Sequence, residues 1–297
     1  MPSAPPAVKT FPLRDAVAVV TGAAGGLGAA IARSLAAQGT HLALVDVDAA
    51  GLAATAAALR TSRPQLTITE HVLDVADRDA VKALPAAVLA THDRVSIVVN
   101  NAGVAIGGRF IDTPEADFDW LMGINFGGTV AMTRAFLPVL AREPVAQLVN
   151  VSSLFGLLAP PGQSAYAASK FAVRGFSESL RHELEHDGSP VGITLVHRGG
   201  VRTGIARNAR ISAPVSAEEL ASAQAAWTDL LRLDPDRAAA RIVQGLQRRE
   251  KRVLVGIDAI AGSWLQRLMP VGYWRHIQRD IERRTRRSGG SLSGAAR

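Results

Sequence analysis

The stretch AVAVVTGAAGGLGAAIARSLA, residues 16–36, sets the fold that we expect for this chain. It opens with a continuous apolar run, which is typical of a strand buried on both faces of a sheet. A glycine-rich turn follows, in which Gly22, Gly26 and Gly28 give the spacing T-G-x-x-x-G-x-G, and a helix is predicted over 26–38. Glycines permit a tight turn and let backbone N–H groups at a helix N-terminus approach a pyrophosphate. On its own, the stretch has a plain strand–helix turn as its alternative interpretation.

Beyond this stretch, short apolar runs alternate with longer amphipathic stretches along most of the chain. Such alternation predicts an α/β fold: a doubly wound parallel sheet of the Rossmann type, with helices on both faces in three αβα layers. A fold of this kind binds its ligand at the carboxyl ends of the strands. The expected strands span 16–20, 42–46, 67–74, 96–100, 147–152, 192–197 and 252–256. The expected helices span 26–38, 49–61, 77–91, 115–142, 165–187 and 234–249.

The length of 297 residues fits one large domain with extensions. We expect a loose, proline-rich leader over 1–14 and a single catalytic domain over 15–256. Residues 203–233 interrupt the alternation and are expected to form a lid. Residues 257–297 form a basic, aromatic C-terminal extension, whose Gly- and Ser-rich end is expected to be disordered.

The composition excludes several kinds of site. The chain has no cysteine, which rules out disulfides, thiolate catalysis and cysteine metal sites. No metal is expected at all, because His182 and His186 lack an accompanying acidic motif. No apolar run reaches the length of a membrane span, and the N-terminus lacks the features of a secretion signal. A cytoplasmic protein is therefore expected, with membrane association as the alternative.

The net charge of +7 is concentrated near the C-terminus. Residues 241–297 hold 13 Lys and Arg against 4 Asp and Glu, so the rest of the chain is slightly acidic and no nucleic-acid partner is expected. Within 257–287, aromatic and aliphatic residues such as Trp264 and Trp274 stand beside arginines. We expect this segment to pack onto protein, and peripheral contact with an anionic membrane is the alternative. Under either interpretation its large apolar side chains should be covered.

The second expected strand ends in Asp46. A carboxylate at this position can accept hydrogen bonds from both hydroxyls of an adenosine ribose and would repel a 2′-phosphate. No Lys or Arg occupies the glycine turn or position 47, so NAD is the expected cofactor. A helix-capping role is the alternative for Asp46, although Asp48 suits that role better.

Polar residues also follow the next strands along the chain. NNAG at 100–103 ends the fourth strand, and Ser153 follows the fifth. Tyr166 and Lys170 come next, four residues apart, so they share one face of a predicted helix. A lone Tyr-x-x-x-Lys is common by chance, but this one follows a complete nucleotide-binding half.

From about Ala16 to Gly256, the chain resembles the short-chain dehydrogenase/reductase family. The features that carry the resemblance, in family order and spacing, are TGAAGGLG at 21–28, Asp46, Asp74, Val75, NNAG at 100–103, Asn125, Ser153 and YAASK at 166–170. The resemblance implies an NAD-dependent oxidoreductase that moves a hydride between NAD and a secondary alcohol or ketone. The cofactor contacts that it implies are Gly22, Gly26, Leu27, Gly28, Asp46, Asp74, Val75, Asn101, Gly103, Tyr166, Lys170, Val201 and Thr203.

The resemblance also implies the chemical roles of four residues. Tyr166 is expected to be the general acid/base, helped by Lys170, because an ammonium at about 4 Å favours the phenolate by roughly 4 kcal/mol at an effective dielectric of ~20. Ser153 is expected to polarise the substrate carbonyl, and Asn125 to hold a water in the proton relay. A non-catalytic NAD-binding regulator or scaffold on the same fold is the alternative function.

After the sixth strand the family usually carries P-G-x-V-x-T, and this chain has Arg198 in place of the proline. Proline would fix φ at that position, so the departure puts the rigidity of the loop in question. An inconsequential change is the favoured interpretation, and a contact with cofactor or substrate is the alternative.

The resemblance also implies which residues line the substrate pocket, and those at the matching positions are apolar: Ile106, Leu154, Phe155 and Ile205. An apolar pocket suits a small hydrophobic alcohol or ketone. Arg210 is expected to be solvated, with binding of an acidic substrate tail as the alternative. By analogy with the family, a homo-oligomer paired through helices 115–142 and 165–187 is expected.

Overall fold

The computed structural model describes residues 10–202, 209–211 and 233–279. Thr203, Ile205, most of the expected lid and the Gly- and Ser-rich end lie outside these residues, as does the leader up to residue 9. The end of the expected leader is not loose: Phe11 and Leu13 are buried in the core, and the Phe11 N–H donates to the Gln247 carbonyl at 2.7 Å. Their apolar side chains extend the domain toward the N-terminus.

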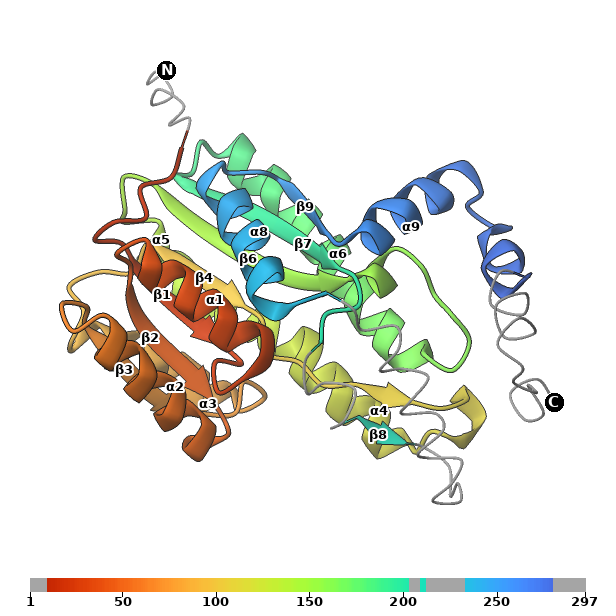
Figure 1. Cartoon of the computed structure of the whole chain (residues 1–297), viewed down its shortest axis with the longest axis horizontal. Coiled ribbons are helices and arrows are strands. Elements are labelled where there is room, and N and C mark those ends of the chain that lie inside the picture. The colour runs from red at the N-terminus through yellow and green to blue at the C-terminus, as the bar shows by residue number, and fades with distance from the viewer. Residues whose placement is uncertain (1–9, 203–208, 212–232, 280–297) are drawn as a thin grey trace.

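Seven strands form one parallel sheet in the order β3-β2-β1-β4-β6-β7-β9 (Figure 1). This is the predicted doubly wound sheet, with strand bounds that differ from the expected ones by at most two residues. The strands are β1 Val17–Thr21, β2 His41–Asp46, β3 Ile68–Val72, β4 Ile97–Asn100, β6 Ala146–Ser153, β7 Val191–Arg198 and β9 Arg252–Val255.

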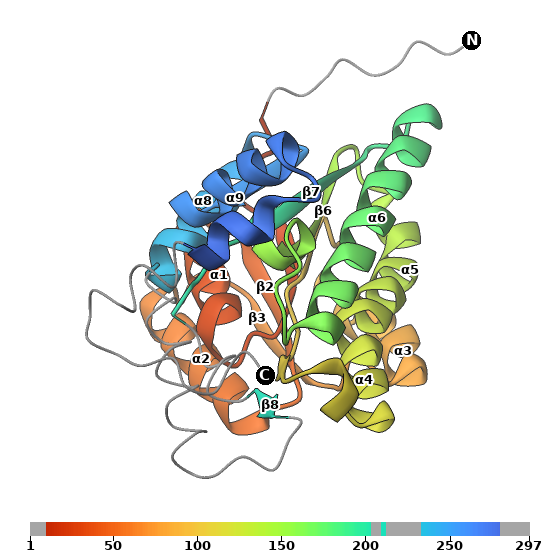
Figure 2. The same cartoon turned by 90° about the vertical axis from the view of Figure 1, so that its right-hand side faces the viewer.

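Helices cover both faces of the sheet (Figure 2). One face packs against α1 (Gly26–Ala37), α2 (Ala49–Ser62) and α8 (Pro235–Gln247), and the other against α3 (Arg78–Leu89), α5 (Thr129–Leu140) and α6 (Ser164–His186). Successive residues of β1 enter opposite layers, Val19 one core and Val20 the other, and both are fully buried. Burial on both faces explains why the strands are continuous apolar runs instead of alternating ones.

The helix expected over 115–142 is helical throughout but not uniform. It consists of α4 (Glu115–Met122), one π-helical segment η2 (Gly123–Gly128) and α5. Gly128 allows close packing here, because a Cβ would meet the Val75 side chain at 2.6 Å. π-Helical turns are often found at functional sites, and this one carries the buried Asn125.

Short elements at the carboxyl edge of the sheet were not expected from the sequence. They are the strands β5 (Ile106–Gly107) and β8 (Arg210–Ile211), which pair in parallel, and the 3₁₀ turns η1 (Phe110–Asp112) and η3 (Leu154–Gly156). Each is too short to give a periodic pattern. Together they extend the structure beyond the strand ends, where a doubly wound fold binds its ligand.

The C-terminal extension begins with α9 (Ile257–Leu268), which projects from the body after β9 (Figure 1). Its small residues face the domain: Ala259 and Gly262 are buried, and a Cβ on Gly262 would meet the Leu154 side chain at 2.5 Å. Its large apolar side chains are exposed, Trp264 by 60% and Leu268 by 74%. The domain itself does not cover these side chains, so cover by a partner subunit or by a membrane stays the prediction.

Candidate active site

The glycine turn after β1 has the backbone geometry that only glycine adopts easily. Gly22 has φ +69° and Gly26 has φ +54°. A Cβ on Gly28 would collide with the carbonyl of Gly22, so the helix can start this close to the turn only without a side chain. No side chain caps α1 and its first turn holds no acidic residue, so the N–H groups of Gly26, Leu27 and Gly28 start a helix whose positive end faces the strand edge.

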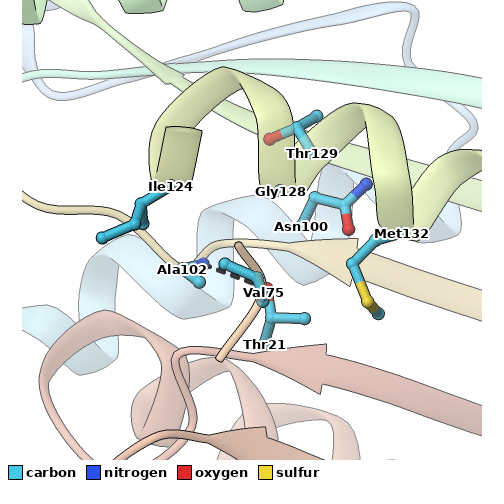
Figure 3. Close-up of a pocket in the computed structure, with 8 residues that line it drawn as sticks. All are labelled: Thr21, Val75, Asn100, Ala102, Ile124, Gly128, Thr129 and Met132. Carbon is cyan, nitrogen blue, oxygen red and sulfur yellow. Dashed lines mark hydrogen bonds between the residues drawn. The ribbon is translucent and has the colours of Figure 1, made fainter. Parts of the chain in front are cut away.

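Thr21 joins this turn to the one after β4 (Figure 3). Its hydroxyl accepts from the N–H groups of Asn101 and Ala102, both at 3.0 Å, and donates to the Val99 carbonyl. The Asn101 amide donates back to the Thr21 carbonyl at 3.0 Å. The two turns meet where the chain order reverses between β1 and β4, which is the switch point at which such sheets bind ligands.

Asp46 ends β2 beside the glycine turn. One carboxylate oxygen accepts from the Ala24 N–H at 2.8 Å and the other from the Asp48 N–H at 3.1 Å. Asp48 itself caps α2, accepting from the Gly51 N–H, so the capping alternative for Asp46 is wrong. The Asp46 carboxylate is thereby fixed at the strand end, partly exposed.

Two further residues expected at the cofactor follow β3. Val75 is buried against Gly128, and the Asp74 carboxylate accepts from the Ala76 N–H at 2.9 Å. Behind them lies a small closed hollow lined by Thr21, Val75, Asn100, Ala102, Ile124, Gly128, Thr129 and Met132 (Figure 3). It is internal packing behind the turns and adds no ligand site.

Tyr166 and Lys170 lie on one face of α6, as their spacing predicts. Tyr166 is 5% and Lys170 4% exposed, and the Lys170 Nζ is 5.7 Å from the centre of the Tyr166 ring. Lys170 donates to the Val151 carbonyl of β6 at 3.2 Å. Gly103 packs closely against both Lys170 and Asn125. A Cβ at this position would lie 3.4 Å from the Lys170 Nζ and only 3.0 Å from the Asn125 Oδ1, so a side chain here would be crowded.

Asn125 is held by three hydrogen bonds to its protein neighbours, and its expected water stays a prediction. Its amide donates to the Val104 carbonyl and to the Ser169 hydroxyl, both at 3.0 Å, and its Oδ1 accepts from the Val104 N–H at 2.8 Å. The side chain therefore ties the loop after β4 to α6. Ser169, which sequence reasoning did not single out, is its partner there and is fully buried.

Ser153 ends β6 and is 7% exposed. Its hydroxyl accepts from the Phe155 N–H at 3.1 Å, which starts η3, and it also forms a hydrogen bond that favours the charged form of Tyr166. Beneath it, the fully buried His197 pairs through Nδ1 with the Ser153 carbonyl at 3.0 Å. Burial lowers the pKa of His197 to about 4, so the ring is neutral and its Nδ1–H is the donor.

Arg198 lies beside Tyr166, a neighbour that the sequence interpretation did not include. It is 8% exposed, and its guanidinium donates to the Tyr166 hydroxyl at 3.3 Å. Arg198 ends β7 and does not lie on a loop, and it contacts Tyr166 directly; whether the change from proline has a functional effect stays a prediction. The signal available in the sequence was the departure from proline itself, which does not indicate where the side chain points.

The loop after β7 is held by hydrogen bonds to other segments, although Arg198 stands where the family usually has proline. The Asp258 carboxylate of α9 accepts from the Gly200 N–H at 2.7 Å, and it lies so close to Gly199 that a Cβ there would collide with it. The Gly199 N–H donates to the Val255 carbonyl at 2.8 Å. Val201, an expected cofactor contact, follows and is fully buried.

Apolar side chains surround the Tyr166 ring. Ile106 is buried in the same apolar cluster as Tyr166. The Phe155 ring packs edge-on against the Tyr166 ring, with the two ring centres 6.1 Å apart. Leu154 instead faces α9 through Gly262, so it is not brought to Tyr166. The cluster also contains Leu121, Phe118 and Trp120 of α4, which the sequence did not single out.

Arg210 is exposed, as expected, and it already has partners within the chain. Its guanidinium stacks on the Trp120 ring at 3.6 Å and pairs with Asp117 at 2.5 Å. Within residues 10–202, 209–211 and 233–279, no group of His, Asp and Glu side chains could hold a metal ion.

These residues fit a nicotinamide dinucleotide. The uncapped start of α1 suits a pyrophosphate, and the space around Gly25 is open, with nothing within 4 Å of where a Cβ would lie. Asp46 stands at the strand end where an adenosine ribose binds in folds of this type.

Comparison with known proteins agrees with this geometry. Residues 16–213 match the family described as short chain dehydrogenase. The chain is 41% identical over 266 residues to a Mycobacterium tuberculosis protein named "Putative oxidoreductase SadH", covering 89% of this chain and 95% of the relative. A short-chain dehydrogenase/reductase from Burkholderia phymatum, solved in complex with NAD, superposes with a TM-score of 0.81 at 31% identity, covering 87% of this chain and 95% of that one.

A metagenomic short-chain oxidoreductase solved in complex with NADP superposes with a TM-score of 0.66 at 30% identity, covering 82% of this chain and 98% of that one. Relatives of the same fold thus bind either dinucleotide. The chain belongs to the short-chain dehydrogenase/reductase family and is an NAD(P)-dependent oxidoreductase.

Proposed function

We propose that this protein is a dehydrogenase that prefers NAD and interconverts a secondary alcohol and a ketone, with Tyr166 as general acid/base. The observation that carries the proposal is the buried Tyr166, which has Lys170 over its ring and Ser153 and Arg198 beside its hydroxyl at the carboxyl ends of β6 and β7. A tyrosine in bulk water ionises near ~10, so a base at neutral pH needs such neighbours. A non-catalytic regulator would have no need of this arrangement.

The residues divide the work as follows. Tyr166 takes the hydroxyl proton of the alcohol or returns it to the ketone oxygen, and Ser153 donates to that oxygen as charge develops. Lys170 favours the phenolate, and Asn125 contributes to a proton relay by fixing the segment after β4 against α6. When bound, NAD supplies the hydride acceptor or donor.

Asp46 supports the preference for NAD. Its carboxylate already accepts hydrogen bonds from two backbone N–H groups, which hold it in place at the end of β2. A 2′-phosphate there would meet a fixed negative charge, and Val47, the next residue, is 68% exposed and offers no countercharge. Val201 and Thr203 remain the proposed contacts to the nicotinamide amide.

The apolar cluster around Tyr166 supports a hydrophobic substrate. Ile106 and Phe155 stand beside the tyrosine and leave few polar groups to anchor a ligand. Leu154 and Ile205 were expected in the same wall; Leu154 faces α9 instead, and Ile205 stays a prediction.

We also propose that the exposed face of α9 contacts an anionic membrane surface. Ile257, Ile260, Trp264 and Leu268 recur at helical spacing on the outer face and are 45–86% exposed. The segment 241–297 carries the basic excess, with 13 Lys and Arg against 4 Asp and Glu, which complements anionic headgroups. No helix among the described residues is long and apolar enough to cross a bilayer. A homo-oligomer and a cytoplasmic location remain predictions.

The proposed function is tested by following NADH at its absorbance band with a panel of secondary alcohols and ketones, each with NAD(H) and NADP(H) in parallel. Tyr166→Phe keeps the ring and removes the proton donor, so kcat should fall at least ~100-fold while NAD binding, measured by calorimetry, is retained. Wild-type protein that binds NAD but turns over nothing in the panel would favour a regulator. A Tyr166→Phe variant with most of its activity would assign the acid/base to another residue.

A further inference from the structure

Arg198 occupies the last position of β7, directly beside Ser153 of β6 in the parallel register. Both strands end at the same edge of the sheet, so both side chains reach the Tyr166 hydroxyl from the sheet, while Lys170 lies over the Tyr166 ring on α6. The Arg198–Tyr166 bond of 3.3 Å links residues 32 apart in the chain. The position of the guanidinium follows from strand register, and the side chain is buried where it cannot be a solvated surface charge.

A buried guanidinium needs an anionic partner, because burying an unpaired charge costs several kcal/mol. Among residues 10–202, 209–211 and 233–279, Arg198 forms no ion pair with a carboxylate, and Tyr166 is its side-chain hydrogen-bond partner. The anion that this site can generate beside it is the phenolate of Tyr166. A guanidinium also keeps its charge on burial better than an ammonium does, and burial lowers the pKa of Lys170.

We propose that Arg198 is a further catalytic residue, a second cation that holds Tyr166 as its phenolate when the enzyme oxidises an alcohol. The inference rests on the proposed role of Tyr166. In that direction the substrate O–H proton passes to the phenolate oxygen, the carbinol C–H bond breaks with its electron pair leaving as hydride to NAD⁺, and the C=O bond forms. Tyr166, now neutral, then loses the proton to solvent.

The electrostatics around the hydroxyl agree with this geometry. Burial raises the pKa of Tyr166, but Arg198, then Lys170 and the hydrogen bond from Ser153, more than reverse the effect and leave it below its ordinary value. Arg198 is the larger of the two cationic causes. The other groups nearby do not compete: His197 stays neutral with a pKa of about 4, and the Asp258 carboxylate bonds the Gly200 N–H.

The sequence allows this to be tested without any activity. The chain has two tyrosines, Tyr166 and Tyr273, so in a Tyr273→Phe background the ultraviolet absorbance of tyrosinate reports Tyr166 alone. Tyr166→Phe in the same background must abolish the signal, which assigns it. We expect Arg198→Gln, which keeps a polar side chain and removes the charge, to raise the titration midpoint by at least about one pH unit.

Two variants serve as controls in this titration. Arg198→Lys keeps the charge and should leave most of the shift in place, which separates loss of charge from loss of packing. Arg202→Gln removes a positive charge from the same segment, but Arg202 is exposed and pairs with Asp234 at 3.6 Å, so the midpoint should not move. Circular dichroism across the pH range checks that each variant is folded.

The outcomes separate this inference from the proposed function. If Arg198→Gln moves the midpoint and the pH profile of kcat/KM for oxidation moves with it, both stand. If the midpoint moves but no variant turns over any alcohol, the proposed function fails and the Arg198–Tyr166 pairing stands. An unchanged midpoint in Arg198→Gln overturns the inference, even if that variant shows a raised KM for an anionic substrate.

Discussion

The carboxylate of Asp258, the second residue of α9, accepts the N–H of Gly200, the second residue after β7, at 2.7 Å. This bond fixes the segment between Arg198 and Val201, so the C-terminal extension supports the active site. Asp258→Ala should destabilise the fold by about 1–2 kcal/mol, as expected for loss of a hydrogen bond to a charged group, and should raise KM for NAD because the segment loosens. Thermal unfolding and steady-state kinetics measure the two effects.

Glu185→Ala is the matched control for Asp258. Glu185 pairs with Lys251 at 2.9 Å on the surface and touches no part of the site. Its removal should cost less than about 1 kcal/mol and leave KM unchanged. Equal effects of the two substitutions on KM would show that the hydrogen bond from Gly200 to Asp258 does not support cofactor binding.

Cofactor choice should follow Asp46. We expect the wild type to prefer NAD over NADP by at least ~10-fold in kcat/KM, or about 1.4 kcal/mol, and Asp46→Ser to remove most of that preference. Asp48→Ser is the matched control, because serine also caps a helix and the residue lies two positions further on. A preference ratio that is the same in wild type and Asp46→Ser would contradict the assignment.

Stability should fall in mild acid because of His197. Burial lowers its folded pKa to about 4 from 6.5, so the unfolded chain binds the proton first as pH drops. The free energy of unfolding is therefore unaffected by this group above pH 6.5, and it falls as the pH drops from 6.5 to about 4. From about pH 7 to about pH 5 we expect a loss of roughly 2 kcal/mol. Burial also lowers the pKa values of His71 and His92, which adds in the same direction.

Chemical denaturation at a series of pH values measures this slope. His197→Gln lowers stability at every pH but should flatten the dependence, whereas His182→Gln, on the exposed face of α6, should leave it as in the wild type. A slope that His197→Gln does not change would mean that the pKa of His197 is the same in the folded and unfolded protein.

Sedimentation with vesicles tests the exposed face of α9. The full chain should bind vesicles rich in anionic lipid, bind neutral vesicles weakly, and lose binding with added salt. Trp264→Ser with Leu268→Ser should abolish binding, and Val72→Ser, which removes an equally exposed apolar residue from β3, should not. If the full chain ignores vesicles and the double variant instead lowers its oligomer size, a second copy of the chain covers this face.

These variants are preferable to a truncation after Gly256. Removing α9 also removes Asp258 and exposes Leu154, so a truncated chain would lose support for the active site along with the apolar face. Substitution of two exposed side chains changes the surface and leaves that support in place.

Periodicity and glycine spacing predict the sheet, its layers and the relation of Tyr166 to Lys170, because these depend on local pattern. The direction of Arg198 does not follow from pattern. It depends on the register that sets Ser153 beside Arg198, a pairing between residues 45 positions apart. The same holds for α9, whose buried residues are the small Ala259 and Gly262. Hydrophobicity alone would predict that the face with Trp264 and Leu268 is the buried one.

The bond between Asp258 and Gly200 has a consequence for how such a site can change over generations. Since α9 holds the loop from outside, the residue at position 198 need not supply the stiffness that a proline would give. Arginine and proline codons can differ by a single base, so one substitution exchanges a rigid ring for a buried charge beside Tyr166. Because the hydrogen bond from α9 holds this segment, the residue at position 198 is free to change the electrostatics around Tyr166 without loosening the segment.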